Sequence, residues 1–374
     1  MSRVGEKGGQ SPVKGPSAPQ TGSARDISTI ILGTIIVLLV ISNVLTYLTL
    51  QGGARTADPS GDRVTLKDFK VVNAHDHLFA RRHLDKYLEA AKKTGVVRTL
   101  FVGSSEYTLM GAGYDQAKGN EENNQVILKV AKELPGKIIP LCTIHPDDED
   151  KVERIKRYVA GGSRGLKLYT GHGNFYDRPL DAEEMLPVYA YCQETGLPIC
   201  WHINLNRYFA DFLRVMKRFP RLTVIIPHFG VTFFRPTGKE FAYFQKLLDT
   251  YPTLYTDTSF GTRAILVSGL EAVSRHPEVF RAFFEKYSDR ILFGTDMVVT
   301  GNKEKTPQWV EAVLRACRDV LEKESFHFFM GAVGSPYAEQ GANNIYGAYR
   351  GLALDDAILR KVYETNVEKL FPSR

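Results

Sequence analysis

One pattern recurs along most of the chain: a short apolar, β-branched run ends in a polar or glycine-rich loop, and an amphipathic helical segment follows. Strands that alternate with helices predict parallel βαβ units, and eight such units on one chain predict a closed (β/α)8 TIM barrel, an α/β fold. No boundary divides residues 66–374, so we expect one barrel domain. The predicted strands are residues 70–75, 96–103, 137–145, 164–169, 198–203, 222–228, 253–259 and 290–296.

The main alternative is an open, doubly wound sheet. Such a sheet usually carries a glycine-rich dinucleotide-binding turn after its first strand. Here the corresponding turn, residues 75–82, reads HDHLFARR and contains no glycine. The sequence therefore favours the barrel.

The amino-terminal part of the chain has a different composition. Residues 1–26 are rich in Gly, Ser, Pro and Lys without apolar periodicity, which predicts a disordered tail. Residues 27–50 carry no charged side chain, and a helix of roughly 20 such residues spans a bilayer. We therefore expect a single transmembrane helix before the barrel, followed by a polar linker at residues 51–65. The sequence GGA at residues 52–54 leaves cleavage open, but a cleavable signal peptide has a shorter apolar run, of roughly 7–15 residues, which favours a retained anchor.

The charges before this segment predict its orientation. Arg3, Lys7, Lys14 and Arg25 outnumber the acidic residues there, and positively charged flanks stay in the cytoplasm. The expected localisation is a single-pass membrane protein with a cytoplasmic N-terminus, contact with the lipid bilayer through residues 27–50, and a catalytic domain outside the cytoplasm.

Composition narrows the class of function. The chain is 43% hydrophobic and 24% charged, which is typical of a globular protein. Its net charge of +6 is modest, and no basic block with interleaved aromatic residues stands out, so we expect no nucleic-acid partner. The four cysteines have neither CxxC spacing nor a disulfide framework, so we expect buried free thiols.

Polar residues gather where the predicted strands end, and in a TIM barrel these ends form the active site. His75 and His77 are two residues apart, so in a strand they project to the same face, while Asp76 between them faces away. The other strand ends supply Lys167, His202, His228 and Asp296. Several imidazoles and one carboxylate at one rim predict a site for Zn²⁺ or another borderline divalent metal.

These motifs resemble a known family. HDH at residues 75–77, GLKLY at 165–169, WH at 201–202, PHFG at 227–230 and FGTD at 293–296 occur in the order found in the amidohydrolase superfamily. The chain is similar in particular to the amidohydrolase-2 branch, which includes a carboxymuconate-semialdehyde decarboxylase, related aromatic-acid decarboxylases and lactonases. The resemblance covers about residues 68–371.

The resemblance implies a role for each strand-end residue. It implies one divalent metal, with Zn²⁺ as the first choice, held by His75, His77, His202 and Asp296. His228 would stand beside the water that the metal activates, as general base or electrostatic partner, and Asp296 would serve as ligand or as proton shuttle. Lys167 would merely line the mouth or pair with a substrate carboxylate, or, if carboxylated, bridge to a second metal.

Arginines near the predicted mouth suggest an anionic substrate. Arg207, Arg235 and Arg263 each lie a few residues past strands five, six and seven, and Arg can bind a carboxylate in bidentate fashion. Tyr169 could reach the mouth from the loop after strand four. Arg81 and Arg82 are weaker candidates because a helix begins there.

Three hypotheses for function follow. The first is a metal-dependent hydrolase that uses metal-activated water on a C–O or C–N bond of a small, carboxylate-bearing substrate. The second is a non-oxidative decarboxylase, a lyase, on the same scaffold, and release of carbon dioxide would separate it from the first. The third is a catalytically silent, tethered binding barrel, which metal analysis and a His75→Ala variant would test. Homo-oligomerisation is left open.

Overall fold

The computed structural model describes residues 66–110, 118–169, 178–261, 264–303, 305–328 and 347–373. The chain divides into two compact units, residues 1–65 and 66–374, and the second is described below. The predicted tail, membrane helix and linker, at residues 1–26, 27–50 and 51–65, lie outside the described residues. The domain boundaries therefore stay a prediction.

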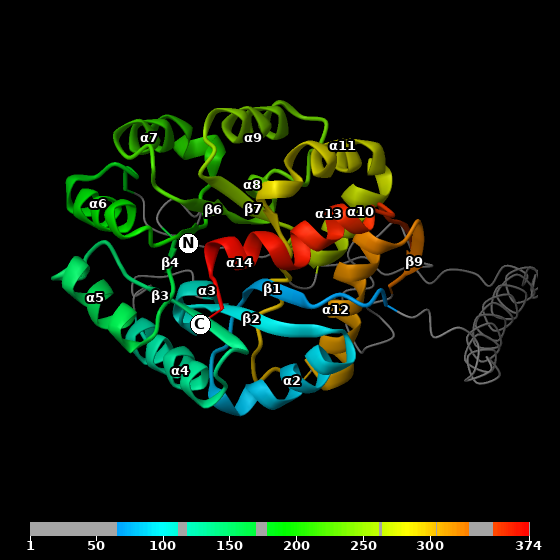
Figure 1. Ribbon diagram of the computed structural model, residues 1–374, viewed down its shortest axis with the longest axis horizontal. Helices are drawn as coiled ribbons and strands as arrows, with labels where there is room; N and C mark the ends of the chain where they lie inside the picture. The colour runs from blue at the N-terminus through cyan, green and yellow to red at the C-terminus, as the bar shows by residue number, and fades with distance from the viewer. Residues whose placement is uncertain are drawn as a thin grey trace, which may run out of the picture. The chain divides into compact units, whose positions relative to one another are not determined.

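An eight-stranded parallel sheet forms a nearly closed barrel, which confirms the predicted α/β fold (Figure 1). Each strand pairs with the next in chain order. The first and eighth strands meet through backbone hydrogen bonds, from Ala74 N to Phe293 O at 2.6 Å and from Asp296 N to His75 O at 2.8 Å. This closure excludes the open-sheet alternative. The strands are β1 (Val71–Asp76), β2 (Val96–Val102), β3 (Ile138–Thr143), β4 (Leu166–Leu168), β5 (Ile199–Trp201), β6 (Val224–Ile226), β7 (Leu254–Asp257) and β8 (Ile291–Leu292).

Helices surround the barrel, and β9 (Ser325–His327) pairs with β10 (Ala348–Arg350) in a small antiparallel sheet. Gly162 and Gly196, at the ends of α5 and α6, have positive φ angles of 116° and 68°, as expected of glycine C-caps. The helical elements are η1 (Arg81–His83), α2 (Leu84–Lys93), α3 (Glu106–Met110), α4 (Asn120–Glu133), α5 (Lys151–Gly161), η2 (Glu183–Met185), α6 (Leu186–Thr195), α7 (Leu205–Arg218), α8 (Pro227–Val231), α9 (Lys239–Thr250), α10 (Ala264–Arg275), α11 (Pro277–Tyr287), η3 (Ser288–Arg290), α12 (Pro307–Glu322), α13 (Asp356–Arg360), η6 (Lys361–Thr365) and α14 (Asn366–Leu370).

The apolar core has two layers because strand side chains alternate between faces. One layer packs the outer face of the barrel against the helices. The other fills the barrel interior and includes Val72 and Ala74 from β1. Phe371, just after α14, joins this inner layer, so the end of the described chain covers the amino-terminal end of the strands and leaves the carboxyl end as the mouth.

The predicted localisation is corrected by the structure. No helix among the described residues has the length and apolarity that a membrane span requires. The longest described helix, α12, has 16 residues, whereas roughly 20 apolar residues are needed to cross a bilayer. The prediction of a single-pass membrane protein with an extracytoplasmic barrel depended on residues 27–50, which lie outside the described residues.

Candidate active site

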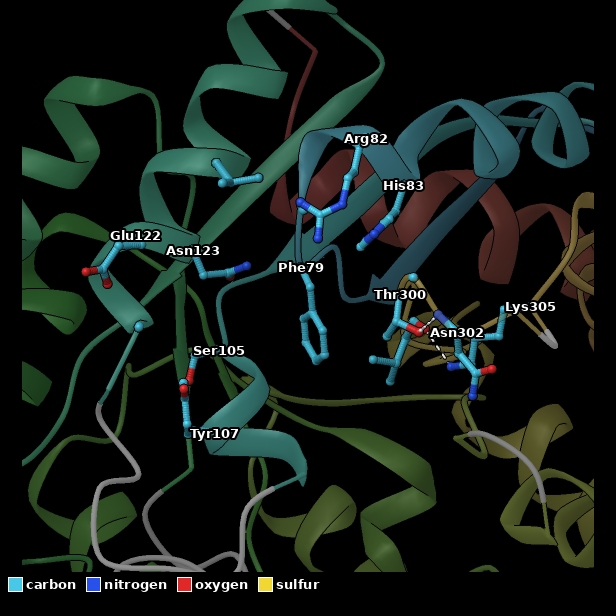
Figure 2. A pocket seen from close by; sticks show the side chains of 15 residues that line it. Phe79, Arg82, His83, Ser105, Tyr107, Glu122, Asn123, Thr300, Asn302 and Lys305 are labelled. Carbon is cyan, nitrogen blue, oxygen red and sulfur yellow. Dashed lines mark hydrogen bonds between the residues drawn. The ribbon is translucent and has the colours of Figure 1, made fainter.

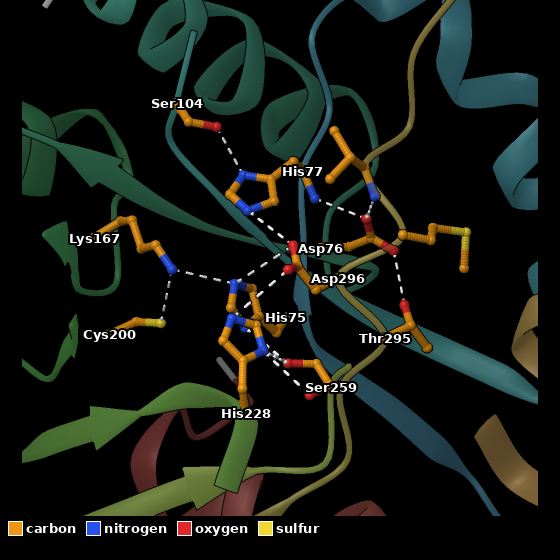
Figure 3. Close-up of polar contacts among 12 residues, drawn as sticks. His75, Asp76, His77, Ser104, Lys167, Cys200, His228, Ser259, Thr295 and Asp296 are labelled. Atoms are coloured by element: carbon orange, nitrogen blue, oxygen red, sulfur yellow. Dashed lines mark hydrogen bonds and ion pairs between the residues drawn. The ribbon is translucent and has the colours of Figure 1, made fainter. Parts of the chain in front are cut away.

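Four side chains from three strand ends meet at the carboxyl mouth of the barrel (Figure 3). His75 lies in β1 and His77 directly follows it, His228 follows β6, and Asp296 follows β8. The Asp296 carboxylate lies 3.1 Å from His77 Nε2 through Oδ1 and 3.7 Å from His228 Nε2 through Oδ2. His75 Nε2 lies 3.9 Å from the same Oδ1. The fold thus brings together residues that are up to more than 200 positions apart in sequence, as the argument from strand ends predicted.

An irregularity in β1 points both histidines into the barrel. Val72 and Ala74 face the interior, so strict alternation would place Asp76 inside and turn His75 towards the helices. The pairing of β1 with β2 shifts register between Asn73 and Asp76, and such a shift re-aims side chains next to it. Asp76 consequently faces away from the cluster, where it accepts hydrogen bonds from Thr295 Oγ1 at 2.9 Å and from the backbone of His77 at 2.8 Å.

His75 is held by a buried carboxylate. Its Nδ1 lies 2.8 Å from Asp257 Oδ2, and both side chains are 1% exposed. A carboxylate can only accept, so Nδ1 carries the proton and Nε2 presents its lone pair to the mouth. Burial alone would raise the pKa of Asp257, but its interactions with His75 and His228 hold it below its ordinary value. Asp257 therefore orients His75 as a carboxylate does in a carboxylate–histidine–metal triad.

His77 is oriented by Ser104, in the loop after β2. Its Nδ1 lies 2.7 Å from Ser104 Oγ, which leaves Nε2 directed at Asp296. Burial lowers the pKa of His77 to about 4, although Asp296 favours the charged form. The imidazole is therefore neutral at pH 7, as a metal ligand must be.

Asp296 occupies a strained backbone position and has an unused acceptor. Its φ is +50°, in the left-handed region that non-glycine residues rarely adopt. Its Oδ1 is buried and accepts no hydrogen bond from any described residue. Burial alone would raise its pKa, but the neighbouring His75, His77 and His228 hold the pKa well below the ordinary value.

His228 lies in a left-handed turn that follows β6. His228 and Phe229 have φ angles of +59° and +51°, and Asp257 Oδ1 accepts the backbone N–H of His228 at 3.0 Å. The Nδ1 of His228 lies 3.1 Å from the carbonyl of Ser259, which can only accept, so Nε2 carries the lone pair. Burial lowers the pKa of His228. The result is a neutral imidazole whose basic nitrogen faces Asp296.

Lys167 is buried at the mouth without a carboxylate partner. Its Nζ donates to His75 Nε2 at 3.2 Å and lies 3.6 Å from Cys200 Sγ. The ring of Tyr169 is 5.1 Å away, and the ammonium forms no ion pair with any carboxylate in the described part of the chain. The ammonium therefore competes for the same imidazole nitrogen that faces Asp296.

The other predicted residues are less closely joined to this cluster. The half-buried ring of His202 lies 4.9 Å from that of His228, but His202 is in neither of the two close ligand groups found among the described residues. Arg207 and Arg235 are exposed, and Arg263 lies outside the described residues. Their predicted roles stay predictions.

Three residues of the site were not among those predicted from the sequence: Asp257, Ser104 and Ser259. Asp257 ends β7, so the strand-end argument applied to it as well. In the structure it contacts both His75 and His228. No sequence pattern would have found Ser104, because its partner His77 comes from a different strand.

The arrangement fits a divalent metal. One close group of ligand atoms comes from His75, His77 and Asp296, and a second comes from His75, His228 and Asp257. In the first group Asp257 and Ser104 direct the Nε2 atoms of His75 and His77 towards a carboxylate oxygen that accepts no hydrogen bond from the described residues. Neutral imidazole and carboxylate are ligands that suit Zn²⁺.

The sequence profile of the amidohydrolase family matches residues 72–373. The chain belongs to the amidohydrolase family. This match covers the whole barrel, and it confirms the family that the strand-end motifs predicted. The family consists of enzymes that are typically metal-dependent, which agrees with the His and Asp ligands of this site. No curated protein matches the sequence of this amidohydrolase.

Solved structures share its fold at low sequence identity. An amidohydrolase from Burkholderia multivorans with bound HEPES is 10% identical, with a TM-score of 0.54, over 82% of this chain and 100% of that one. A probable 2-pyrone-4,6-dicarboxylic acid hydrolase from Acinetobacter baumannii with citric acid bound is 13% identical, with a TM-score of 0.53, over 81% and 99%. An uncharacterised TIM-barrel protein from Bordetella bronchiseptica is 15% identical, with a TM-score of 0.50, over 82% and 99%. At sequence identities this low, the similarity to these structures shows the shared fold alone.

Proposed function

We propose that this amidohydrolase is a metal-dependent hydrolase that cleaves a C–O or C–N bond in a small, carboxylate-bearing substrate. One observation carries the proposal: the buried Asp296 Oδ1 has no hydrogen-bond donor among the described residues, yet it faces the Nε2 atoms of His75 and His77. His75, His77 and Asp296 would hold the metal, with His202 as the fourth ligand. Zn²⁺ is the metal that this donor set suits best.

A bound divalent metal would supply Lewis acidity and lower the pKa of water towards neutrality. The residues of this chain would position the reactants and move the proton. His228 Nε2 is an unprotonated base at neutral pH, because Nδ1 bears the proton and burial lowers the pKa. Asp296 Oδ2 lies 3.7 Å from it, a separation that one water molecule would bridge, so both groups could act on the same water as general base and then general acid.

The buried charge of Lys167 supports an anionic substrate. An ammonium without a carboxylate partner is costly to bury, and the described residues provide none for Lys167. A substrate carboxylate would fill that role. The Acinetobacter baumannii neighbour, a probable hydrolase of a dicarboxylic acid, has citric acid bound, and it supports the same class of substrate.

Metal analysis and a substrate panel test the proposal on the full-length protein. We expect about one metal ion per chain, hydrolysis within a panel of lactones, esters and amides that carry a carboxylate, and loss of both properties in His75→Ala. His276→Ala, which changes a histidine outside the mouth with a 38% exposed side chain, is the matched control and should retain both.

Other outcomes would favour the other hypotheses. Release of carbon dioxide from aromatic acids, without hydrolysis of the panel, would replace the hydrolase by a decarboxylase. A protein that binds no metal and turns over no member of the panel would indicate a silent barrel.

A further inference from the structure

A cavity opens at the carboxyl face of the barrel. It has a volume of about 620 Å³ and lies among the loops that follow β1, β2 and β8 (Figure 2). These loops belong to the carboxyl face of the barrel, where the substrates of TIM-barrel enzymes bind. None of the proposed metal ligands lines the cavity, so it is a separate compartment, and its volume is in the range that small ligands occupy.

Arg82, which lines the cavity, differs in its partners from its neighbour Arg81, which does not line it. Arg81 is paired, with Nε 2.7 Å from Glu133 Oε2 and Nη1 3.0 Å from Asp85 Oδ1. Arg82 points into the cavity (Figure 2) and makes neither an ion pair nor a hydrogen bond with any described residue. Its guanidinium therefore has its donors available for a ligand.

His83 contributes a second unused polar atom. Its Nδ1 is buried and has no hydrogen-bond partner within the described part of the chain. The ring packs against Gly301, where a Cβ atom would lie only 2.9 Å from His83 Nε2. Glycine at this position makes room for the imidazole, and buried polar atoms without a partner are rare in native proteins.

Two segments that line the cavity also carry residues of the proposed metal site. Phe79 lies two residues after His77, and Val298 lies two residues after Asp296. Lys305 Nζ donates to the carbonyls of Met297 and Val298, both at 2.6 Å, and so holds the loop that carries Asp296 against the cavity. A molecule in the cavity would therefore contact the segments that carry two of the proposed ligands.

We propose that this cavity binds the carboxylate group of a small organic anion through Arg82 and His83. A guanidinium can bind a carboxylate through two parallel hydrogen bonds, and the imidazole of His83 can donate a third. Phe79 and Val298 would pack against the carbon part of the anion. Glu122 is the one acidic side chain among the residues that line the cavity, so the lining favours a negative ligand.

The carboxylate could come from two sources: the remote end of a substrate whose other end reacts at the metal site, or a separate anion. A direct binding measurement tests the site whichever source supplies the carboxylate. This measurement does not depend on the proposed hydrolase activity. In calorimetric titrations of the full-length protein with benzoate, we expect binding to weaken about tenfold or more in Arg82→Ala and in His83→Phe. Arg81→Ala, which removes the same charge from the neighbouring position, should bind benzoate like the wild type.

A pair of esters separates the two sources. Mono-4-nitrophenyl adipate and 4-nitrophenyl hexanoate have acyl chains of equal length and differ in the terminal carboxylate. If the cavity holds the remote end of the substrate, Arg82→Ala should raise KM about tenfold for the adipate ester alone. If it holds a separate anion, Arg82→Ala should leave the kinetics of both esters unchanged while benzoate binding is lost.

Three results would overturn the inference. The first is an absence of benzoate binding to the wild type up to about 10 mM. The second is equal binding by the wild type and Arg82→Ala, and the third is an equal loss in Arg81→Ala and Arg82→Ala. Failure of the proposed function looks different: neither ester is hydrolysed by the wild type, whereas benzoate binding still depends on Arg82.

Discussion

Two buried polar clusters in this barrel differ in how completely their atoms are satisfied. The first, which we term the helix cluster, consists of Arg318, Glu322 and Tyr363. Arg318 Nε lies 2.6 Å from Glu322 Oε1, and its other nitrogens donate to the carbonyls of Thr94 and Lys67 at 2.6 and 2.7 Å. Tyr363 OH donates to Glu322 at 2.8 Å. Every charged group in it has a partner.

The second, the mouth cluster, consists of His75, His77, His228, Asp257 and Asp296. It contains an unused carboxylate oxygen and borders the unpaired ammonium of Lys167. His228 and Asp296 also have positive φ angles. A satisfied buried network stabilises one conformation, whereas strain and unused acceptors persist where a ligand completes the site. The helix cluster therefore serves stability, and the mouth cluster serves chemistry.

The largest effect should come from Asp296→Asn. The amide cannot hold a metal as the carboxylate does, nor act as general base or general acid, so kcat should fall by about 10²- to 10⁴-fold. The free energy of unfolding should fall less than in Arg318→Met, because the buried Oδ1 accepts no hydrogen bond from the described residues. Steady-state kinetics and denaturant titration measure the two. Asp289→Asn, at a side chain that is 75% exposed, is the control, and equal activity of the two variants would contradict the assignment.

Arg318→Met should have the opposite effects on stability and on catalysis. It leaves Glu322 buried without its partner, so the free energy of unfolding should fall by about 3–5 kcal/mol while kcat per folded molecule stays unchanged. The double variant Arg318→Met/Glu322→Met should recover most of the loss in a urea titration. A double variant as unstable as the single one would show that the cluster stabilises the fold in some other way.

His77 should make the metal-free protein less stable in acid. Its pKa is about 4 in the folded state against 6.5 ordinarily, so between these values the unfolded chain binds a proton that the folded one does not. Stability contributed by the neutral imidazole is therefore lost as the pH falls through this window, by about 3 kcal/mol in total. In chelator-treated samples, unfolding curves for the wild type should lose this amount relative to His77→Gln between pH 6.5 and pH 4. If the free energies of unfolding of the wild type and His77→Gln changed in parallel with pH, the proposed role of His77 would be refuted.

Asp257→Asn should weaken metal binding by about 10- to 100-fold, because an amide no longer fixes the tautomer and orientation of His75. Competition with a chromogenic chelator measures the change. An affinity equal to that of the wild type would mean that the 2.8 Å contact between Asp257 and His75 does not orient the ligand.

The smallest effect should come from Lys167→Met. The ammonium donates to His75 Nε2 at 3.2 Å and repels a cation there, so its removal should tighten metal binding by about tenfold. The same competition with a chromogenic chelator measures the metal affinity of this variant. Weaker binding instead would indicate that Lys167 is carboxylated and bridges two metals.

The sequence by itself determined the architecture of the described domain. Alternation of β-branched runs with amphipathic helices is a local property, since each segment buries its own apolar face. It predicted all eight strands of the barrel, and the strand-end rule located His75, His77, His228 and Asp296 at one mouth.

Only the tertiary structure decided which atoms meet. The interior alternation of Val72 and Ala74 predicts the wrong face for His75, and the register shift of β1 against β2 corrects it. The role of Asp257 and the difference between Arg81 and Arg82 likewise depend on partners from other elements. Such contacts are set by the packing of distant segments, whose energies no local pattern in the chain encodes.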